Sequence, residues 1–343
     1  MPFSLHIRSD MRPGFTLAAT IAGLRQRLAP ALLFPAIATL AAATPAVADI
    51  KVVATIKPIH ALVAGVMDGI GSPDLLVTGS ASPHTFALKP SGARALNEAA
   101  VVFGVSPAVE PFTVKIFASL PKRVKIVTLS DAPGVQHLAA RREATFEAHD
   151  HADHGDHDDH GAAVHGASDG HVWLDPQNAK AMADEIARAL SEASPGDAVR
   201  LAANATRVKA EIDAMNQEIA VTLAPVKTRP YVVFHDAYQY FERHYGLSPA
   251  GAITVGPDIQ PGAKRLGEIR RKIGDLAAVC VFAEPQYSSN VMRAVTDGTN
   301  ARFGTLDPEG ALVEPGAGAY AALMRNLATN LRVCLDGTSS EGG

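Results

Sequence analysis

Histidine and aspartate dominate one segment of the chain, residues 149–171. Imidazole and carboxylate are the ligand set of zinc and of its transition-metal neighbours, and short histidine-rich tracts indicate metal binding by composition. The spacing is irregular and almost no apolar residue is available for burial, which predicts a solvated loop that collects metal with low affinity. Its candidate ligands are His149, His151, His154, His157, His160 and His165.

Four further positions could form one tight site. His84 lies in the loop after one expected strand, and His235 and Asp307 directly follow two others. His171 precedes Asp175, an expected helix cap. Because ligands of open α/β sheets bind beyond the carboxyl ends of the strands, these side chains could converge between two lobes. Three imidazoles with one carboxylate or water make a tetrahedral zinc site.

Each of these residues also has a purely structural interpretation. His84 could be an ordinary loop histidine, and His171 could simply end the histidine tract. His235 could form a surface pair with Asp236, and Asp307 could belong to an Asx turn. The metal hypothesis therefore depends on their joint placement after strands.

The elements that must position these side chains alternate between strand and helix, which predicts parallel βαβ units and an α/β fold. The expected strands are 51–56, 75–78, 101–105, 125–129, 231–234, 252–255, 279–283 and 302–306. The expected helices are 58–66, 91–99, 176–192, 196–223, 238–245, 261–272, 288–298 and 320–333. We expect Ser91 near the N-cap of its helix, Asp175 as an N-cap followed by Pro176, and Gly246 as a helix end.

The helix expected over 196–223 should connect two lobes. Its apolar residues repeat at three- and four-residue steps from Ala202 to Leu223, and no proline or glycine follows Gly196. A helix of that length would span about 40 Å, enough to act as a rigid backbone. The predicted architecture is two mainly parallel (β/α) lobes with a metal site in the cleft between them. The predicted divisions are 1–48, a signal peptide; 49–175, a first lobe with the histidine loop 147–169; 176–223, helices; and 224–343, a second lobe.

The N-terminus has the features of an export signal. Arg25 and Arg27 precede an apolar run, and Ala46–Ala48 form an A-x-A cleavage pattern. A transmembrane anchor is the alternative, which Pro30, Pro35 and Pro45 disfavour. We therefore expect cleavage near Ala48 and a soluble protein outside the cytoplasm.

Charge and cysteine content fit that compartment. The chain has a formal net charge of −4, so no basic footprint for nucleic acid is present. Cys280 and Cys334 are the two cysteines, and an even pair in an oxidising compartment predicts a disulfide. Two metal thiolates are the alternative, although no CxxC spacing occurs.

Five short motifs then carry a resemblance that covers essentially the whole mature chain. They are PHTFALKPS at 83–91, HVWLDP at 171–176, VFHDAY at 233–238, FAEPQ at 282–286 and GTLDP at 304–308. This ordered series resembles the ZnuA-type zinc receptors of bacterial ABC importers, which belong to the metal-receptor substrate-binding family. The resemblance implies two α/β lobes bridged by one long helix, with metal bound between them.

The resemblance also implies roles for individual residues. His84, His171 and His235 would be metal ligands, 149–165 the variable charged histidine loop, and Cys280–Cys334 a structural disulfide. The implied cargo is Zn²⁺, and the implied setting is the periplasm. The implied partners are a membrane permease and a periplasmic zinc chaperone, with the receptor a monomer.

The fourth ligand stays open. Some relatives carry a ligand Glu immediately before the first histidine, where this chain has Pro83. The fourth ligand would then be Asp307, a water or a loop residue. Glu284 is a candidate partner for a ligand histidine, since such histidines usually donate their other N–H to a carboxylate or carbonyl.

The sequence therefore favours a periplasmic zinc-binding receptor without catalysis. A manganese or other divalent-metal receptor or adhesin of the same family is the main alternative. Manganese receptors resemble the zinc ones but carry Glu where this chain has His235, and a third imidazole favours zinc. A metallochaperone and a secreted zinc hydrolase are further alternatives. The hydrolase is disfavoured because the sequence has no HExxH motif and no obvious Glu base beside a ligand histidine.

Overall fold

The structure is a computed structural model that describes residues 50–141, 168–254, 263–275, 278–287 and 295–337. Contacts join Ala48–Gly343 into one compact unit. The predicted signal segment and the six histidines of the tract lie outside the described residues. The predicted division of the mature chain at 175 and 223 stays a prediction.

Two parallel four-stranded sheets carry the fold, which confirms the predicted α/β class. Their strand orders are β2-β1-β3-β4 and β6-β5-β7-β8, and every neighbouring pair is parallel. The strands are β1 (Val52–Ala54), β2 (Asp74–Leu75), β3 (Val101–Gly104), β4 (Lys125–Thr128), β5 (Tyr231–His235), β6 (Pro249–Thr254), β7 (Cys280–Ala283) and β8 (Arg302–Thr305). In each sheet the chain order reverses beside the first strand, β1 or β5, and such switch points are where α/β sheets bind ligands.

The helices fall close to their predicted places. They are α1 (Lys57–Val66), α2 (Pro90–Glu98), α3 (Thr113–Ser119), α4 (Pro176–Ala193), α5 (Ala198–Leu223), α6 (Gln239–Tyr245), α7 (Ala263–Asp275) and α9 (Ala319–Asp336). The predicted cap of α4 is confirmed, since the Asp175 carboxylate accepts from the Gln177 N–H at 2.8 Å and Pro176 occupies the first turn. Gly246 ends α6 at a φ of 66°, a left-handed conformation that favours glycine. The helix expected over 288–298 lies largely outside the described residues.

Several details differ from the sequence predictions. Strand β2 is shorter than expected. Helix α2 begins one residue earlier than expected, at Pro90, because a proline is favoured at the first helical position; its N-cap is Lys89, two residues before Ser91. Helix α3 was not predicted, and its seven residues are too few to display an apolar stripe.

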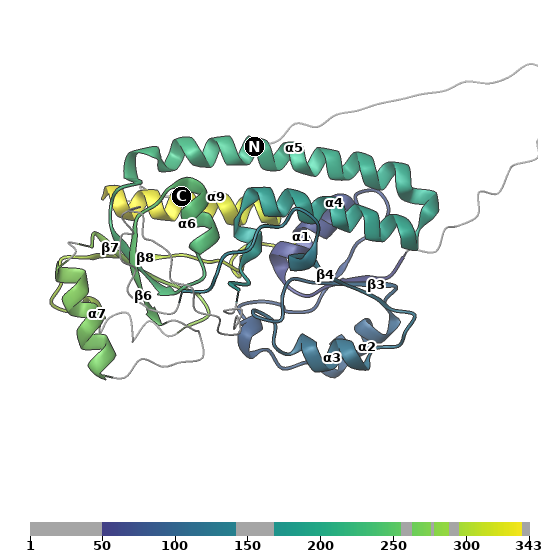
Figure 1. The fold of residues 1–343 in the computed structure, drawn as a ribbon, viewed down its shortest axis with the longest axis horizontal. Coiled ribbons are helices and arrows are strands. Elements are labelled where there is room, and N and C mark those ends of the chain that lie inside the picture. The colour runs from purple at the N-terminus through teal and green to yellow at the C-terminus, as the bar shows by residue number, and fades with distance from the viewer. Residues whose placement is uncertain (1–49, 142–167, 255–262, 276–277, 288–294, 338–343) are drawn as a thin grey trace, which may run out of the picture. The chain divides into compact units, whose positions relative to one another are not determined.

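Helix α5 has 26 residues and connects the two lobes as predicted. It packs against α1, α4 and α9, and Figure 1 shows it extending over both sheets. Its buried stripe begins at Leu201 instead of Ala202, which is exposed, and continues as predicted from Ala205 to Leu223. At 1.5 Å per residue the helix is about 39 Å long.

Each sheet has an inner and an outer face because successive side chains of a strand point to opposite sides. On β1, Val52 and Ala54 face a large core that α1, α4, α5 and α9 share, while Val53 faces the opposite side. On β5, Tyr231 faces that same shared core, and Val232 faces a smaller cluster that includes residues of α7. One continuous core therefore ties both lobes to the helical layer.

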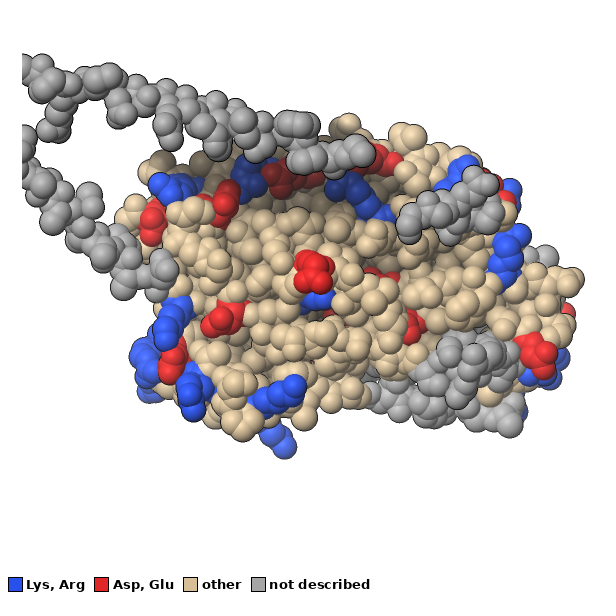
Figure 2. All heavy atoms as spheres, turned by 180° about the vertical axis from the view of Figure 1, so that it is seen from behind, with Lys and Arg blue, Asp and Glu red and all other residues tan. Residues whose placement is uncertain are grey.

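Ion pairs on the surface contribute little to the stability of the fold. On the face in Figure 2, acidic and basic side chains are scattered within a larger uncharged area. Ion pairs such as Lys51–Glu98 and Arg207–Glu211 are substantially exposed. Exposed pairs of this kind contribute little to stability because solvent screens them. Among the described residues, no helix has the length and apolar character needed to cross a membrane.

Cys280 and Cys334 form a disulfide, which confirms the predicted pairing and makes the thiolate alternative wrong. The bond joins the start of β7 to α9 across 54 residues of sequence. It therefore fastens the second sheet to the shared helical layer.

We predict that Cys280→Ser with Cys334→Ser lowers the free energy of unfolding by about 2–4 kcal/mol, because a cross-link of this length restricts the unfolded chain. Urea unfolding of the metal-free protein, followed by circular dichroism, measures the change. The native fold should persist, since the cysteines lie in the core away from the histidines. An unchanged unfolding midpoint would contradict the prediction.

Candidate metal centre

Three histidines from distant parts of the sequence meet at one point. The potential ligand atoms of His84, His171 and His235 all lie within 4.8 Å of one another. The ring centroids are 5.4 Å apart for His84 and His171, 5.7 Å for His84 and His235, and 5.3 Å for His171 and His235. The two Nε2 atoms of His171 and His235 are separated by 3.5 Å. The structure thus brings together the three imidazoles that the sequence singled out.

Local structure explains how each ring reaches this point. His235 is the last residue of β5, so its ring lies at the carboxyl edge of the second sheet. His84 occupies a short 3-10 turn, Pro83–Thr85, in the connection from β2 to α2. His171 precedes a second 3-10 turn, Val172–Leu174, that leads into α4. The site is therefore assembled from both lobes.

Trp173 secures the turn beside His171. Its indole N–H donates to the Pro308 carbonyl at 3.0 Å, and its own carbonyl accepts from the Tyr320 hydroxyl at 2.8 Å. The indole is fully buried. The segment carrying His171 is thus held by groups that come from the second lobe.

Glu284, the candidate carboxylate partner from the sequence, lies beside His235. The His235 Nδ1 lies 2.7 Å from a Glu284 oxygen, and both side chains are buried. The pairing of Val232 with Val281, continued to the strand ends, places the two residues side by side. A carboxylate that accepts the Nδ1 proton leaves the Nε2 lone pair free for a metal.

Asp169 does the same for His171, and the sequence analysis missed it. One Asp169 oxygen lies 2.7 Å from the His171 Nδ1 and accepts the His171 backbone N–H at 3.0 Å. In the sequence Asp169 was grouped with the aspartates of the histidine tract. Its position two residues before a candidate ligand was the signal that could have separated it from them.

His84 has a different environment. Its Nε2 is buried and has no hydrogen-bond partner among the described residues. Burial, followed by the influence of His171 and His235, lowers the pKa of His84 from its usual value to about 2. His84 is therefore neutral at any physiological pH, and its orphaned nitrogen fits a metal ion, since an unpaired buried polar atom costs about 1–3 kcal/mol.

His235 holds its proton more tightly. Burial disfavours its charged form, but the adjacent Glu284 carboxylate outweighs burial and raises the pKa of His235 above its usual value. A metal ion must displace that proton to bind Nε2 as part of a neutral ring. Occupancy of the cluster should therefore decrease as the pH falls.

Asp307 lies outside the group of three rings. One of its oxygens accepts the Leu312 backbone N–H at 3.0 Å, and the other accepts from the Gln286 amide at 3.4 Å. The Lys57 ammonium fixes the following loop by donating to the carbonyls of Gly310 and Val313, each at 2.6 Å. Its predicted role as fourth ligand remains a prediction.

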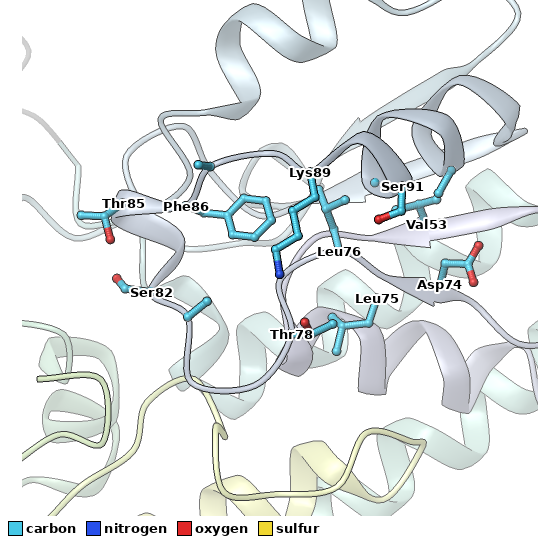
Figure 3. A pocket seen from close by; sticks show the side chains of 14 residues that line it. Val53, Asp74, Leu75, Leu76, Thr78, Ser82, Thr85, Phe86, Lys89 and Ser91 are labelled. Carbon is cyan, nitrogen blue, oxygen red and sulfur yellow. The ribbon is translucent and has the colours of Figure 1, made fainter.

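A pocket of about 590 Å³ lies on the other side of the segment that carries His84. Figure 3 shows Lys89 pointing into it, with Phe86 and Leu76 beside it and Ser82 at its edge. None of the three clustered histidines lines this pocket. The pocket is therefore separate from the candidate metal centre.

The arrangement is suited to holding a borderline-soft divalent cation. Three imidazole nitrogens favour zinc over manganese, which prefers oxygen-rich, higher-coordinate sites. The nearby carboxylates Asp169 and Glu284 are both engaged with ligand rings. Neither is free to act as the general base that a zinc hydrolase requires.

Comparison with known proteins gives consistent matches along the chain. The family model for ZnuA, described as zinc-uptake complex component A, periplasmic, matches residues 52–334. The high-affinity zinc uptake system protein ZnuA of Brucella abortus (strain 2308) is 44% identical over 304 residues, covering 83% of this chain and 91% of that protein. The protein of the same name from Yersinia pestis is 39% identical over 296 residues, covering 84% of this chain and 92% of that protein.

Solved structures share the fold. A crystal structure of ZnuA superposes with a TM-score of 0.69 at 24% identity, covering 84% of this chain and 99% of that chain. A mutant of the laminin-binding adhesin Lmb from Streptococcus agalactiae superposes with a TM-score of 0.66 at 22% identity, covering 84% and 98%. Because receptors and an adhesin share this architecture, the fold alone does not decide between them.

We predict that Glu284→Gln shifts the pH dependence of zinc binding. In the wild type, zinc is lost as the pH falls through the raised pKa of His235. The amide removes the charge that raises that pKa, so the proton competes only at lower pH in the variant. At neutral pH, affinity should fall about tenfold because the ring loses its orienting carboxylate.

Competition with a chromophoric chelator between about pH 5 and 8 measures both effects. Glu211→Gln, on the exposed face of α5, is the matched control. A variant that loses zinc at the same pH as the wild type would show that Glu284 does not govern the proton on His235.

Proposed function

This chain belongs to the ZnuA family of periplasmic zinc-uptake components, and we propose that it captures Zn²⁺ and delivers it to the membrane permease of an ABC importer. The observation that carries the proposal is the buried group of three imidazoles, two of them oriented by carboxylates. The family consists of metal receptors and not enzymes, so the hydrolase alternative has no support. The relatives from Brucella abortus and Yersinia pestis are both named for high-affinity zinc uptake, which disfavours the manganese and adhesin alternatives.

We assign His84, His171 and His235 as the zinc ligands through their ring nitrogens. Their convergence from both lobes supports the assignment, as does the neutral state of His84. The fourth position belongs to Asp307 or to a water, since four-coordinate zinc is the usual geometry for such donors. Asp307 follows β8 at the same edge of the sheet as His235 and Glu284.

Capture proceeds by exchange of the ion's hydration water for imidazole nitrogens. The rings of His171 and His235 are held by carboxylates before the ion arrives, which reduces the entropy lost on binding. Asp169 and Glu284 accept the Nδ1 protons of two rings and supply negative charge close to the cation. Because His235 must lose its proton, a fall in pH favours release of the ion.

The remaining parts of the proposal concern the setting of the protein. The signal segment 1–48 is cleaved near Ala48, and the mature receptor acts as a monomer in the periplasm. Lobes 49–175 and 224–343, joined by the helices of 176–223, present the loaded site to the permease. A periplasmic zinc chaperone is a second partner, which donates the ion or accepts it. The histidines of the tract collect zinc with low affinity.

We predict that His84→Ala, His171→Ala and His235→Ala each lower zinc affinity by at least about a hundredfold, because each removes one of three protein nitrogens. Asp307→Asn should cost less than about tenfold, since its oxygens already accept other hydrogen bonds. His137→Ala is the matched control, an exposed histidine outside the group. Chelator competition measures all five variants, and wild-type affinity in any of the three ring variants would remove that residue from the site.

We also predict that zinc binding survives removal of the histidine tract. Deleting 142–167 and joining the ends through a short Asn-Gly turn is geometrically permitted, because Ala139 and Ser168 are partners in an antiparallel bridge. Calorimetry should find one tight zinc site and weak manganese binding. Extending the deletion through Asp169 should weaken that site about tenfold, because His171 loses its orienting carboxylate. Loss of tight binding in the shorter deletion would locate the principal site in the tract.

A further inference from the structure

The described residues on either side of the segment 142–167 lie beside the metal centre. These two flanks, residues 138–141 and 168–169, are here named the insertion root. The flanks pair through the bridge between Ala139 and Ser168, and the Asp169 N–H donates to the Leu138 carbonyl at 2.9 Å. Since Asp169 also orients His171, the root and a ligand ring form one hydrogen-bonded unit.

A single hydroxyl fastens both flanks to the second lobe. The Tyr240 hydroxyl, on α6, accepts from the Leu138 N–H at 2.9 Å and donates to the Asp169 carbonyl at 2.9 Å. This contact restrains the backbone of Asp169 directly. Helix α6 begins only a few residues after His235. The Tyr240 contact therefore also links the segment that carries His171 to the segment that carries His235.

Arg141 makes the second and stronger fastening. Its Nη1 donates to Asp236 at 2.8 Å and to Glu242 at 2.9 Å. Both carboxylates are buried, with side chains 6% and 2% exposed, and the Arg141 side chain is 23% exposed. The Tyr231 hydroxyl donates to the other Glu242 oxygen at 3.2 Å, which extends the network. Charge-assisted hydrogen bonds at such low exposure are among the stronger polar contacts in proteins.

From these contacts we propose that Arg141 is a positioning residue of the metal site. It fixes the insertion root against the turn after β5 and against α6, and so sets the spacing between His171 and His235. Asp236, its partner, directly follows His235, while the root carries Asp169 and through it His171. The inference rests on the proposed function only in that the three rings hold a metal ion.

A purely electrostatic role for Arg141 would have the opposite consequence. A guanidinium near the site repels a divalent cation, so its removal would slow metal release if charge were its main contribution. Loss of positioning leaves the two rings free to separate, so release becomes faster. The direction of change in the dissociation rate therefore distinguishes the two roles.

The test measures zinc release from Arg141→Met into an excess of chelator, together with the visible absorption of the Co²⁺-loaded protein. We expect release about tenfold faster than in the wild type, the lower end of the effect usual for outer residues of metal sites. The Co²⁺ bands should weaken and broaden because one nitrogen is lost from part of the population. Arg141→Lys should restore most of both properties.

Three further variants keep the test decisive. Arg243→Met, an exposed arginine on the same helix as Tyr240, is the matched control and should leave release unchanged. Tyr240→Phe removes one hydroxyl and no charge, and should accelerate release in the same direction as Arg141→Met. If Arg141→Met fails to fold, Arg141→Met combined with Glu242→Gln removes one unpaired buried charge and is used in its place.

The outcomes separate this inference from the proposed function. Weak zinc binding by the wild type would contradict the proposed function itself. Tight wild-type binding with unchanged or slower release in folded Arg141→Met would overturn the positioning role alone. Faster release with rescue by lysine, and a parallel effect in Tyr240→Phe, would support it.

Discussion

Three imidazoles must be held close together at a buried point, and the rest of the structure serves that requirement. An isolated imidazole nitrogen in the interior loses its hydrogen bonds to water, which is unfavourable unless a metal replaces them. The orphaned Nε2 of His84 shows this condition directly, and its pKa, lowered to about 2, ensures that it presents a lone pair. The carboxylates on His171 and His235 supply the compensating charge without occupying the ligand positions.

The fold supplies the rigidity that such a cluster needs. The residues of the metal centre lie near the carboxyl ends of the two parallel sheets. A core shared by α1, α4, α5 and α9 holds the sheets together. Lys57 and Trp173 then carry contacts from one lobe to the backbone of the other. Arg141 and Tyr240 add a third connection at the insertion root. His171 and His235 are thus restrained by groups from outside their own segments.

Much of this could be predicted from the sequence, because the relevant signals are local. The alternation of strands and helices, the apolar stripe of α5 and the Asp175 cap each depend on neighbouring residues, and the five motifs marked the three histidines. The stabilising contacts could not be predicted in the same way. Arg141 contacts Glu242, which lies 101 positions later in the sequence, and the spacing of apolar residues carries no information about such a distant pair. Asp169 was hidden by the composition of the tract, and α3 was too short to show a stripe.

The most direct test of the central claim is a crystal structure of the zinc-loaded mature protein, with anomalous diffraction recorded above and below the zinc absorption edge. The account predicts one strong anomalous peak bonded to ring nitrogens of His84, His171 and His235, with Asp169 and Glu284 still on the opposite nitrogens of their rings. A principal zinc peak bound instead by residues of the histidine tract, with the three rings unligated, would contradict it.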